Sequence, residues 1–336
     1  MTTDKKPRVY VIATGGSISC IGRSRIDYVN YSDDDRHLTI QEMLQRVPEV
    51  AEFADVRAEQ FSNVYGGGLV PADWLMLARR INQIFRDDRD AAGVAVTHGT
   101  STLEETAYFL NLTVKDRRPV VVTGAMRPPG GLGTDADQNI FDCIRVAAAP
   151  KSAEKGVLVV LNNEIHAARE VSKSHSSRVS TFRSADFGCI GYADVDQRIY
   201  YYRGPLAAHT AASEFDPEKI EVLPRVDIAY AYTGADGVAI RALAAAGARG
   251  IVSAGLGSGT APPEFFAALD EVRAQGVSVA IATHTGSGRA RRSDKMVARG
   301  FVVADNLAPK KARILLMLAL TVSNDPQEIQ RMMFTY

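Results

Sequence analysis

Short apolar runs alternate with longer amphipathic segments along most of the chain, and this alternation constrains the fold more than any other feature. Each short run is rich in β-branched residues and ends in turn residues, which is typical of a buried strand. In the first part of the chain the pattern predicts strands at 8–13, 56–61, 93–97, 120–123 and 156–161, and helices at 38–47, 71–85, 103–112 and 136–148. Strands and helices that alternate in this way form a doubly wound, mostly parallel α/β sheet.

A second, smaller alternation occupies the C-terminal third. Strands are predicted at 226–231, 250–254 and 277–282, with helices from 237, at 262–275 and at 309–321. The segment 200–224, with its three consecutive tyrosines and three prolines, separates the two patterns. With 336 residues the chain is long enough for two domains. We therefore expect a larger N-terminal domain at 1–199, a linker at 200–224 and a smaller α/β domain at 225–336.

Charge and cysteine content exclude several classes of partner. The net charge is zero and no long basic block occurs, which argues against nucleic acid or an anionic membrane surface as the main partner. No apolar run reaches the length of a membrane span, and no apolar leader precedes the first strand. Cys20, Cys143 and Cys189 are odd in number and lack metal-ligand spacing. We expect a cytoplasmic protein that acts on a small molecule.

Three turns rich in hydroxyl side chains are the candidate site. They are 14–19, 97–102 and 172–177, and the third contains Lys173. A hydroxyl becomes a nucleophile when a neighbouring base accepts its proton, and a lysine is one such base. For each residue taken alone a structural role is favoured, as a helix cap for a serine or threonine and as a solvated charge for Lys173. Ligands bind beyond the carboxyl ends of parallel strands, so several such turns at one sheet edge favour a site.

Other polar features indicate neither a metal nor a nucleotide. His98, His166 and His175 lack a short ligand pattern, so we expect structural roles for them. The glycine-rich loop 255–259 matches neither a Walker sequence nor the GxGxxG spacing.

Two of these turns resemble known signatures. The stretch 13–18 reads ATGGSI, which is similar to ATGGTI, and 97–107 reads THGTSTLEETA, which is similar to THGTDTxEETA. The segments 124–128, 169–173 and 309–313 resemble further blocks in the same order. Over nearly its full length the chain resembles the bacterial L-asparaginase/glutaminase family.

The resemblance implies an amidohydrolase that works through a covalent acyl-enzyme, with neither a metal nor an organic cofactor. It implies that Ser17, in place of the family's threonine, is the nucleophile, and that Tyr31 or Tyr28 is its neighbouring tyrosine. Thr100 and Lys173 would form the second hydroxyl–lysine group. Backbone N–H groups near Ser17 and Thr100 would stabilise the oxyanion. The family also implies a homo-oligomer, a dimer or a tetramer.

The residues that would bind the substrate depart from the family. The resemblance implies substrate-binding roles for Gly66, Gly67, Gly99 and Ser101. Ser101 replaces the aspartate that holds the substrate α-ammonium, and Gly66-Gly67 replaces a Ser-Gln/Glu pair. In the second domain the family's asparagine-bearing loop reads Gly-Ser-Gly-Thr at 257–260.

The acidic residue that a neighbouring subunit lends to the site would fall within 286–294. That loop carries Arg289, Arg291 and Arg292, and Asp294 is its only acidic residue.

Three functions follow as alternatives. The first is cleavage of a small amide that lacks a free α-ammonium, because the groups that would hold an amino-acid head are missing. The second is an L-asparaginase proper, which releases aspartate and ammonia. The third is a catalytically weak relative that binds a small ligand. Retention of Ser17, Thr100 and Lys173 together favours an enzyme.

Overall fold

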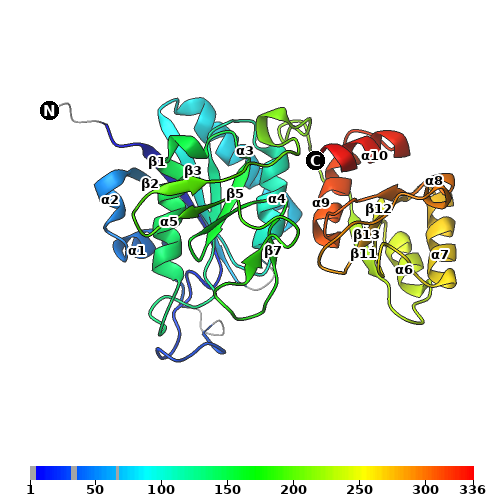
Figure 1. Ribbon diagram of the computed structural model, residues 1–336, viewed down its shortest axis with the longest axis horizontal. Helices are drawn as coiled ribbons and strands as arrows, with labels where there is room; N and C mark the ends of the chain where they lie inside the picture. Colours follow the sequence, from blue (N-terminus) through cyan, green and yellow to red (C-terminus); the bar gives the residue numbers. More distant parts are fainter. Residues whose placement is uncertain (1–4, 32–35, 66–67) are drawn as a thin grey trace. The chain divides into compact units, whose positions relative to one another are not determined.

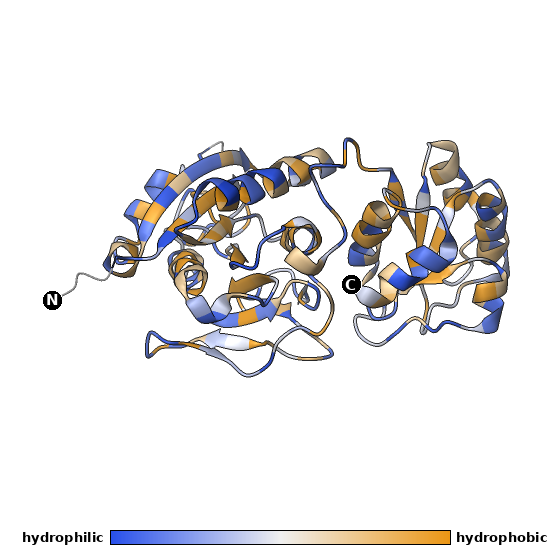
Figure 2. Cartoon of the chain, turned by 90° about the horizontal axis from the view of Figure 1, so that it is seen from above, coloured by the Kyte–Doolittle hydropathy of each residue, from blue (hydrophilic) through white to orange (hydrophobic). Residues whose placement is uncertain are grey.

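The computed structural model describes residues 5–31, 36–65 and 68–336, and the chain divides into two compact units (Figure 1). The first unit extends to Ala212 and the second runs from Ser213 to Tyr336. In each unit hydrophobic residues concentrate on the interior strands, whereas the surrounding helices carry hydrophobic and hydrophilic faces (Figure 2).

The first unit is built on a mixed sheet, which among the described residues has eight strands in the order β10-β9-β6-β5-β4-β3-β1-β2. The pairs β1–β2, β1–β3, β3–β4 and β4–β5 are parallel, and β5–β6, β6–β9 and β9–β10 are antiparallel. A separate two-stranded hairpin consists of β7 and β8. The strands are β1 (Arg8–Gly15), β2 (Asp55–Val64), β3 (Ala91–Thr97), β4 (Val120–Thr123), β5 (Val157–Leu161), β6 (Glu164–Ala167), β7 (Ser172–Lys173), β8 (Phe182–Arg183), β9 (Gly191–Ala193) and β10 (Ile199–Tyr201).

The helices of the first unit bury apolar faces against this sheet. Val9, Val11 and Ala13 of β1 belong to one core cluster with Ile140 and Ile144 of α5. The helix α4 is buried along nearly its whole length. The helix α3 begins at Pro71, which is tolerated there because the N–H that proline lacks would have no partner within the helix in the first turn. The helices are α1 (Ile40–Gln45), α2 (Val50–Phe53), α3 (Pro71–Asp87), α4 (Leu103–Thr113) and α5 (Ala136–Ala148), with 3-10 turns η1 (Pro150–Ser152) and η2 (Thr210–Ala212).

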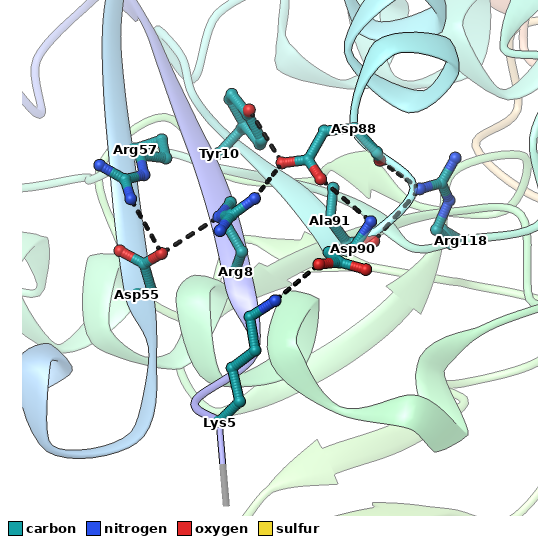
Figure 3. Close-up of polar contacts among 9 residues, drawn as sticks. All are labelled: Lys5, Arg8, Tyr10, Asp55, Arg57, Asp88, Asp90, Ala91 and Arg118. Carbon is teal, nitrogen blue, oxygen red and sulfur yellow. Dashed lines mark hydrogen bonds and ion pairs between the residues drawn. The ribbon is translucent and has the colours of Figure 1, made fainter.

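A cluster of charged side chains links the amino end of β1 to those of its neighbours β2 and β3 (Figure 3). Arg8 donates from Nε to Asp55 Oδ2 (3.1 Å) and from Nη1 to Asp88 Oδ2 (2.7 Å), and Tyr10 also donates to Asp88 (3.1 Å). The hydrogen bond from Arg8 is the main reason that the pKa of Asp88 lies below its ordinary value. Arg118 Nη1 donates to the Asp88 backbone carbonyl (2.9 Å). The cluster fixes the start of β1 relative to its neighbours.

The second unit has a four-stranded parallel sheet, in the order β11-β12-β13-β14 among the described strands. Its core joins apolar residues of β11–β14 to the inner faces of α6 and α7, such as Ile240, Phe265 and Leu269. The elements are β11 (Val226–Tyr230), α6 (Val238–Ala245), β12 (Gly250–Gly255), α7 (Pro263–Ala274), β13 (Ser278–Thr283), α8 (Asp294–Ala298), β14 (Val302–Val303), α9 (Pro309–Ala319) and α10 (Pro326–Thr335).

The predicted fold class is confirmed, with a larger, mostly parallel sheet followed by a smaller α/β unit. The pattern did not predict the short strands β6–β10, of which β6, β9 and β10 continue the first sheet in antiparallel fashion, whereas β7 and β8 form the separate hairpin. The expected linker 200–224 is divided between the two units, because Tyr200 and Tyr201 pair with β9 and the first unit extends to Ala212.

Candidate active site

A cavity of about 470 Å³ lies at the carboxyl ends of β1, β2 and β3 in the first unit. It brings together six of the eight residues predicted from the sequence: Ser17, Tyr31, Gly99, Thr100, Ser101 and Lys173. Gly66 and Gly67 lie outside the described residues, although Tyr65 and Gly68 on either side of them line the cavity. The remaining lining residues are Thr14, Gly16, Tyr28, Val64, Leu69, His98, Thr102, Met126, Arg127, Ser176 and Ser177.

The turn after β1 presents Ser17 to this cavity. Gly16 has φ +92°, and a Cβ atom on it would lie 2.1 Å from the Cα of Gly99, so only glycine fits this position. The Ser17 side chain is buried, and its Oγ donates to the Ala125 carbonyl oxygen at 2.6 Å. Thr14 is turned to the sheet, where its Oγ1 donates to the Thr97 carbonyl at 2.9 Å. Both residues line the cavity, and in this structure each hydroxyl donates to a backbone carbonyl, Ser17 to the segment after β4 and Thr14 to the end of β3.

Tyr28 and Tyr31 both line the cavity, and their hydroxyls have different partners. Tyr28 donates to the Leu132 carbonyl at 2.6 Å. Burial, followed by the neighbouring Tyr65, raises the pKa of Tyr31 above its ordinary value, and a hydrogen bond with Ser17 acts in the opposite direction. The rings of Tyr31 and Tyr65 meet edge to face, with centroids 6.3 Å apart. Tyr31 is the tyrosine next to the Ser17 hydroxyl, and it remains protonated at neutral pH.

Thr100 and Lys173 form a hydrogen-bonded pair on the same cavity wall. Lys173 Nζ donates to Thr100 Oγ1 at 2.8 Å, and the Thr100 side chain is buried. Lys173 belongs to β7, where it is opposite Phe182 of β8, so the hairpin fixes its backbone. Its backbone N–H also donates to Oε1 of the fully buried Glu104, at 3.4 Å. The turn predicted at 172–177 thus begins as a short strand that directs the lysine to the threonine.

Polar partners on both sides hold His98 beneath the turn. Its Nδ1 lies 2.8 Å from the Gly99 carbonyl oxygen, and because a carbonyl only accepts, Nδ1 carries the proton. Nε2 then accepts from Thr106 Oγ1 at 2.9 Å, and Trp74 Nε1 donates to the same Thr106 oxygen at 2.9 Å. Burial lowers the pKa of His98 to about 4. His98 is therefore neutral at neutral pH and supports the turn; the sequence predicted a structural role but not the charge state.

This buried histidine should make stability depend on pH. The unfolded chain takes up a proton near pH 6.5, whereas folded His98 does so only near pH 4, so stability falls as the pH falls between these values. The loss attributable to His98 is on the order of 3 kcal/mol. Urea unfolding of wild type and His98→Gln from pH 7 to pH 4 measures it, because the variant lacks the titrating ring and should show the smaller decline. Equal declines in the two proteins would contradict the assignment.

The cavity wall carries an excess of positive charge. Arg127 and Lys173 line it, and no aspartate or glutamate does so among the lining residues that the structure describes. Ser101, which also lines the cavity, is exposed and carries no charge.

Across 5–31, 36–65 and 68–336, no group of three or more His, Cys, Asp or Glu side chains could hold a metal ion. In the same part of the chain, no helix combines the length and the apolar character that crossing a bilayer requires.

Sequence reasoning missed several groups around the cavity. The Ala125 carbonyl is a backbone atom and carries no residue signature. Trp74 and Thr106 come from α3 and α4, and only the fold brings them to His98. Arg127, in contrast, belongs to the quoted block 124–128, and a cation directly after β4 was a usable signal.

The second unit has a basic depression of its own. The loops 257–260 and 286–294 meet where Arg291 N donates to the Ser258 carbonyl at 3.1 Å. Arg289 pairs with Asp305, while Arg291 and Arg292 line the same space of about 720 Å³. Asp294 is the first residue of α8 and does not line this space.

The chain is similar to known proteins along its whole length. Residues 8–206 match the family model "Asparaginase, N-terminal", and residues 225–333 match "Glutaminase/Asparaginase C-terminal domain". The glutaminase-asparaginase of Pseudomonas fluorescens biotype A is 38% identical over 340 residues, covering 100% of this chain and 92% of the relative. L-asparaginase 2 of Bacillus subtilis (strain 168) is 39% identical over 324 residues, covering 96% and 85%. The crystal structure of a probable cytoplasmic L-asparaginase from Campylobacter jejuni superimposes with a TM-score of 0.94 at 38% identity, covering 98% of this chain and 100% of that one.

Proposed function

The chain belongs to the bacterial L-asparaginase/glutaminase family and is an amidohydrolase acting on carbon–nitrogen amide bonds, and from this premise we propose that Ser17 is its nucleophile. Ser17 Oγ attacks the amide carbonyl, ammonia or an amine leaves, and water then hydrolyses the acyl-enzyme. The electrostatic influence of Ser17 on the pKa of Tyr31 and the position of both residues on the cavity wall support this assignment.

Thr100 and Lys173 are the proposed proton-transfer pair. The 2.8 Å contact between Lys173 Nζ and Thr100 Oγ1 supports the pairing, because proton transfer requires hydrogen-bond distance. Backbone N–H groups near Ser17 and Thr100 are the proposed donors to the oxyanion. The proposed mechanism uses neither a metal nor an organic cofactor.

We propose that the substrate is a small amide without a free α-ammonium. One observation carries this proposal: the cavity presents Arg127 and Lys173 but no carboxylate among its described lining residues. An ammonium that leaves water for such a wall has no counter-charge. The alternatives are that Asp294 of another copy supplies the charge and L-asparagine remains the substrate, or that the chain is a weakly active ligand-binding relative.

A substrate panel tests this specificity. We expect kcat/KM for succinamate, N-acetylasparagine or a cyclic imide to exceed that for L-asparagine. Ser101→Asp should shift the preference towards L-asparagine by roughly tenfold or more, since a hydrogen bond to a charged group contributes about 1.5–3 kcal/mol. A clear preference of the wild type for free L-asparagine would refute the proposal, and release of no acid or ammonia from any amide would favour the binding protein.

We also propose that the protein is a homo-oligomer, a dimer or a tetramer, in which the loop 286–294 completes the site of a neighbouring copy. The exposed Arg291 and Arg292 support this, because the depression that they line contains no described carboxylate. Light scattering combined with activity measurements across a dilution series should show activity falling as the assembly dissociates. A fully active monomer would contradict the proposal.

A cytoplasmic location is proposed as well. All three cysteines are free, which suits a reducing compartment. The name of the Campylobacter jejuni relative points the same way.

A further inference from the structure

Arg127 is a cation of the cavity wall to which the proposed chemistry gives no role. It lies beyond β4 and lines the same cavity as Ser17. The other cation, Lys173, already donates from Nζ to Thr100. In the described part of the chain, no carboxylate forms an ion pair with the Arg127 guanidinium. Its charge is therefore available to a ligand in the cavity.

Arg127 is half-buried, and contacts of its backbone and its guanidinium position it. Its backbone N–H donates to Asp135 Oδ1 at 2.9 Å, and its Nη1 donates to the Gly133 carbonyl at 2.8 Å. Asp135 stands at the N-terminal cap of α5, yet its carboxylate bonds this loop and makes no side-chain cap to the helix. The Arg127 Cζ atom also lies 5.8 Å from the centre of the Tyr28 ring.

Gly133 leaves the space that the guanidinium needs. It has φ +62°, and a Cβ atom on it would approach Arg127 Nη1 to 2.6 Å. A guanidinium that a carbonyl and a ring already position loses little conformational entropy when it binds a ligand. Such preorganisation strengthens binding.

We propose that Arg127 binds a carboxylate of the substrate and thereby selects amides that carry a carboxylate away from the scissile bond. The ligand class is the monoamide of a small dicarboxylic acid. The guanidinium fork matches a carboxylate in geometry and in charge. This inference rests on the proposed amidohydrolase function and assigns a specificity-determining residue to it.

The test compares two substrates of nearly equal size that differ in charge, succinamate (anionic) and succinamide (neutral). Arg127→Met should lower the ratio of kcat/KM for succinamate to that for succinamide by roughly 10–100-fold, the size expected for loss of a hydrogen bond to a charged group. Arg127→Lys keeps the charge but not the fork, so its ratio should be intermediate. Arg25→Met is the matched control, because Arg25 is exposed nearby but does not line the cavity, and its ratio should equal that of wild type.

A binding measurement separates this inference from the proposed function. Succinate should raise the melting temperature of wild type and Arg25→Met but not that of Arg127→Met, whether or not either amide is hydrolysed. If the wild type hydrolyses neither amide but succinate still stabilises it through Arg127, the two amides are not substrates. The carboxylate-binding site would then be retained and the substrate proposal refuted. An unchanged substrate ratio in Arg127→Met, or equal succinate effects in wild type and Arg127→Met, would overturn the inference.

Discussion

Replacement of Ser17 by alanine should reduce kcat on the best amide substrate by on the order of 10⁴-fold or more, because the covalent step loses its nucleophile. The Ser17 side chain is small, and its Oγ makes one hydrogen bond, to the Ala125 carbonyl, apart from its contact with Tyr31. The variant should therefore fold normally, with an unchanged circular dichroism spectrum and a melting temperature within a few degrees of wild type. Steady-state ammonia release measures the loss.

Ser17→Thr is the informative control for this prediction. It keeps the hydroxyl and restores the residue of the family signature, so we expect activity within about tenfold of wild type. Trapping of the acyl-enzyme by mass spectrometry should label the peptide containing residue 17 in wild type and in Ser17→Thr, but not in Ser17→Ala. Wild-type activity in Ser17→Ala would refute the nucleophile assignment and make Thr100 the next candidate.

Replacement of Lys173 by methionine should reduce kcat by about 10²–10⁴-fold, the range for loss of a general acid–base group. Methionine preserves most of the side-chain volume, so β7 should stay paired with β8 and the fold should be retained. The change removes the Nζ donor to Thr100, which lies 73 residues away in the sequence. The kcat should fall much more than KM rises, because the pair acts on protons and does not hold the substrate.

Two further variants sharpen the Lys173 experiment. Thr100→Val removes the other partner of the pair. The double variant with Lys173→Met should lose little more kcat than either single variant, because the effects of residues that act as a unit are not additive. Lys219→Met removes a largely exposed lysine of the second unit and should leave kcat unchanged. Fully additive effects of Thr100→Val and Lys173→Met would argue against a shared proton-transfer role.

The central strands and helices were predictable because the hydrophobic pattern of each segment by itself indicates its secondary structure and its buried face. The strand β4 and the helix α5 begin and end at the predicted residues, since continuous β-branched runs and a clear amphipathic period define them locally. The strands β7 and β8 have two residues each, Ser172–Lys173 and Phe182–Arg183, and no pattern of that length predicts a strand. They form because the two segments meet in the folded chain, which is a tertiary effect.

The site was predictable in its residue types but not in its electrostatics. The turns containing Ser17 and Thr100 could be located because they follow strands of one parallel sheet. The neutral state of His98 could not be predicted, because it depends on complete burial and on partners from α3 and α4. Nor could the sequence predict that no described carboxylate neutralises Arg127, because this depends on which side chains line the folded cavity.

The backbone contact between Gly16 and Gly99 has a consequence for how this family can diversify. The turn that contains Ser17 and the turn that contains Thr100 meet backbone to backbone at these two glycines, and the Thr14 side chain adds a hydrogen bond to the Thr97 carbonyl. Under the proposed roles, replacement of Ser17 by threonine or of Ser101 by aspartate leaves this backbone contact in place, because neither residue takes part in it. Chemistry and substrate choice can evolve as separate traits on this scaffold, as long as the two glycines persist.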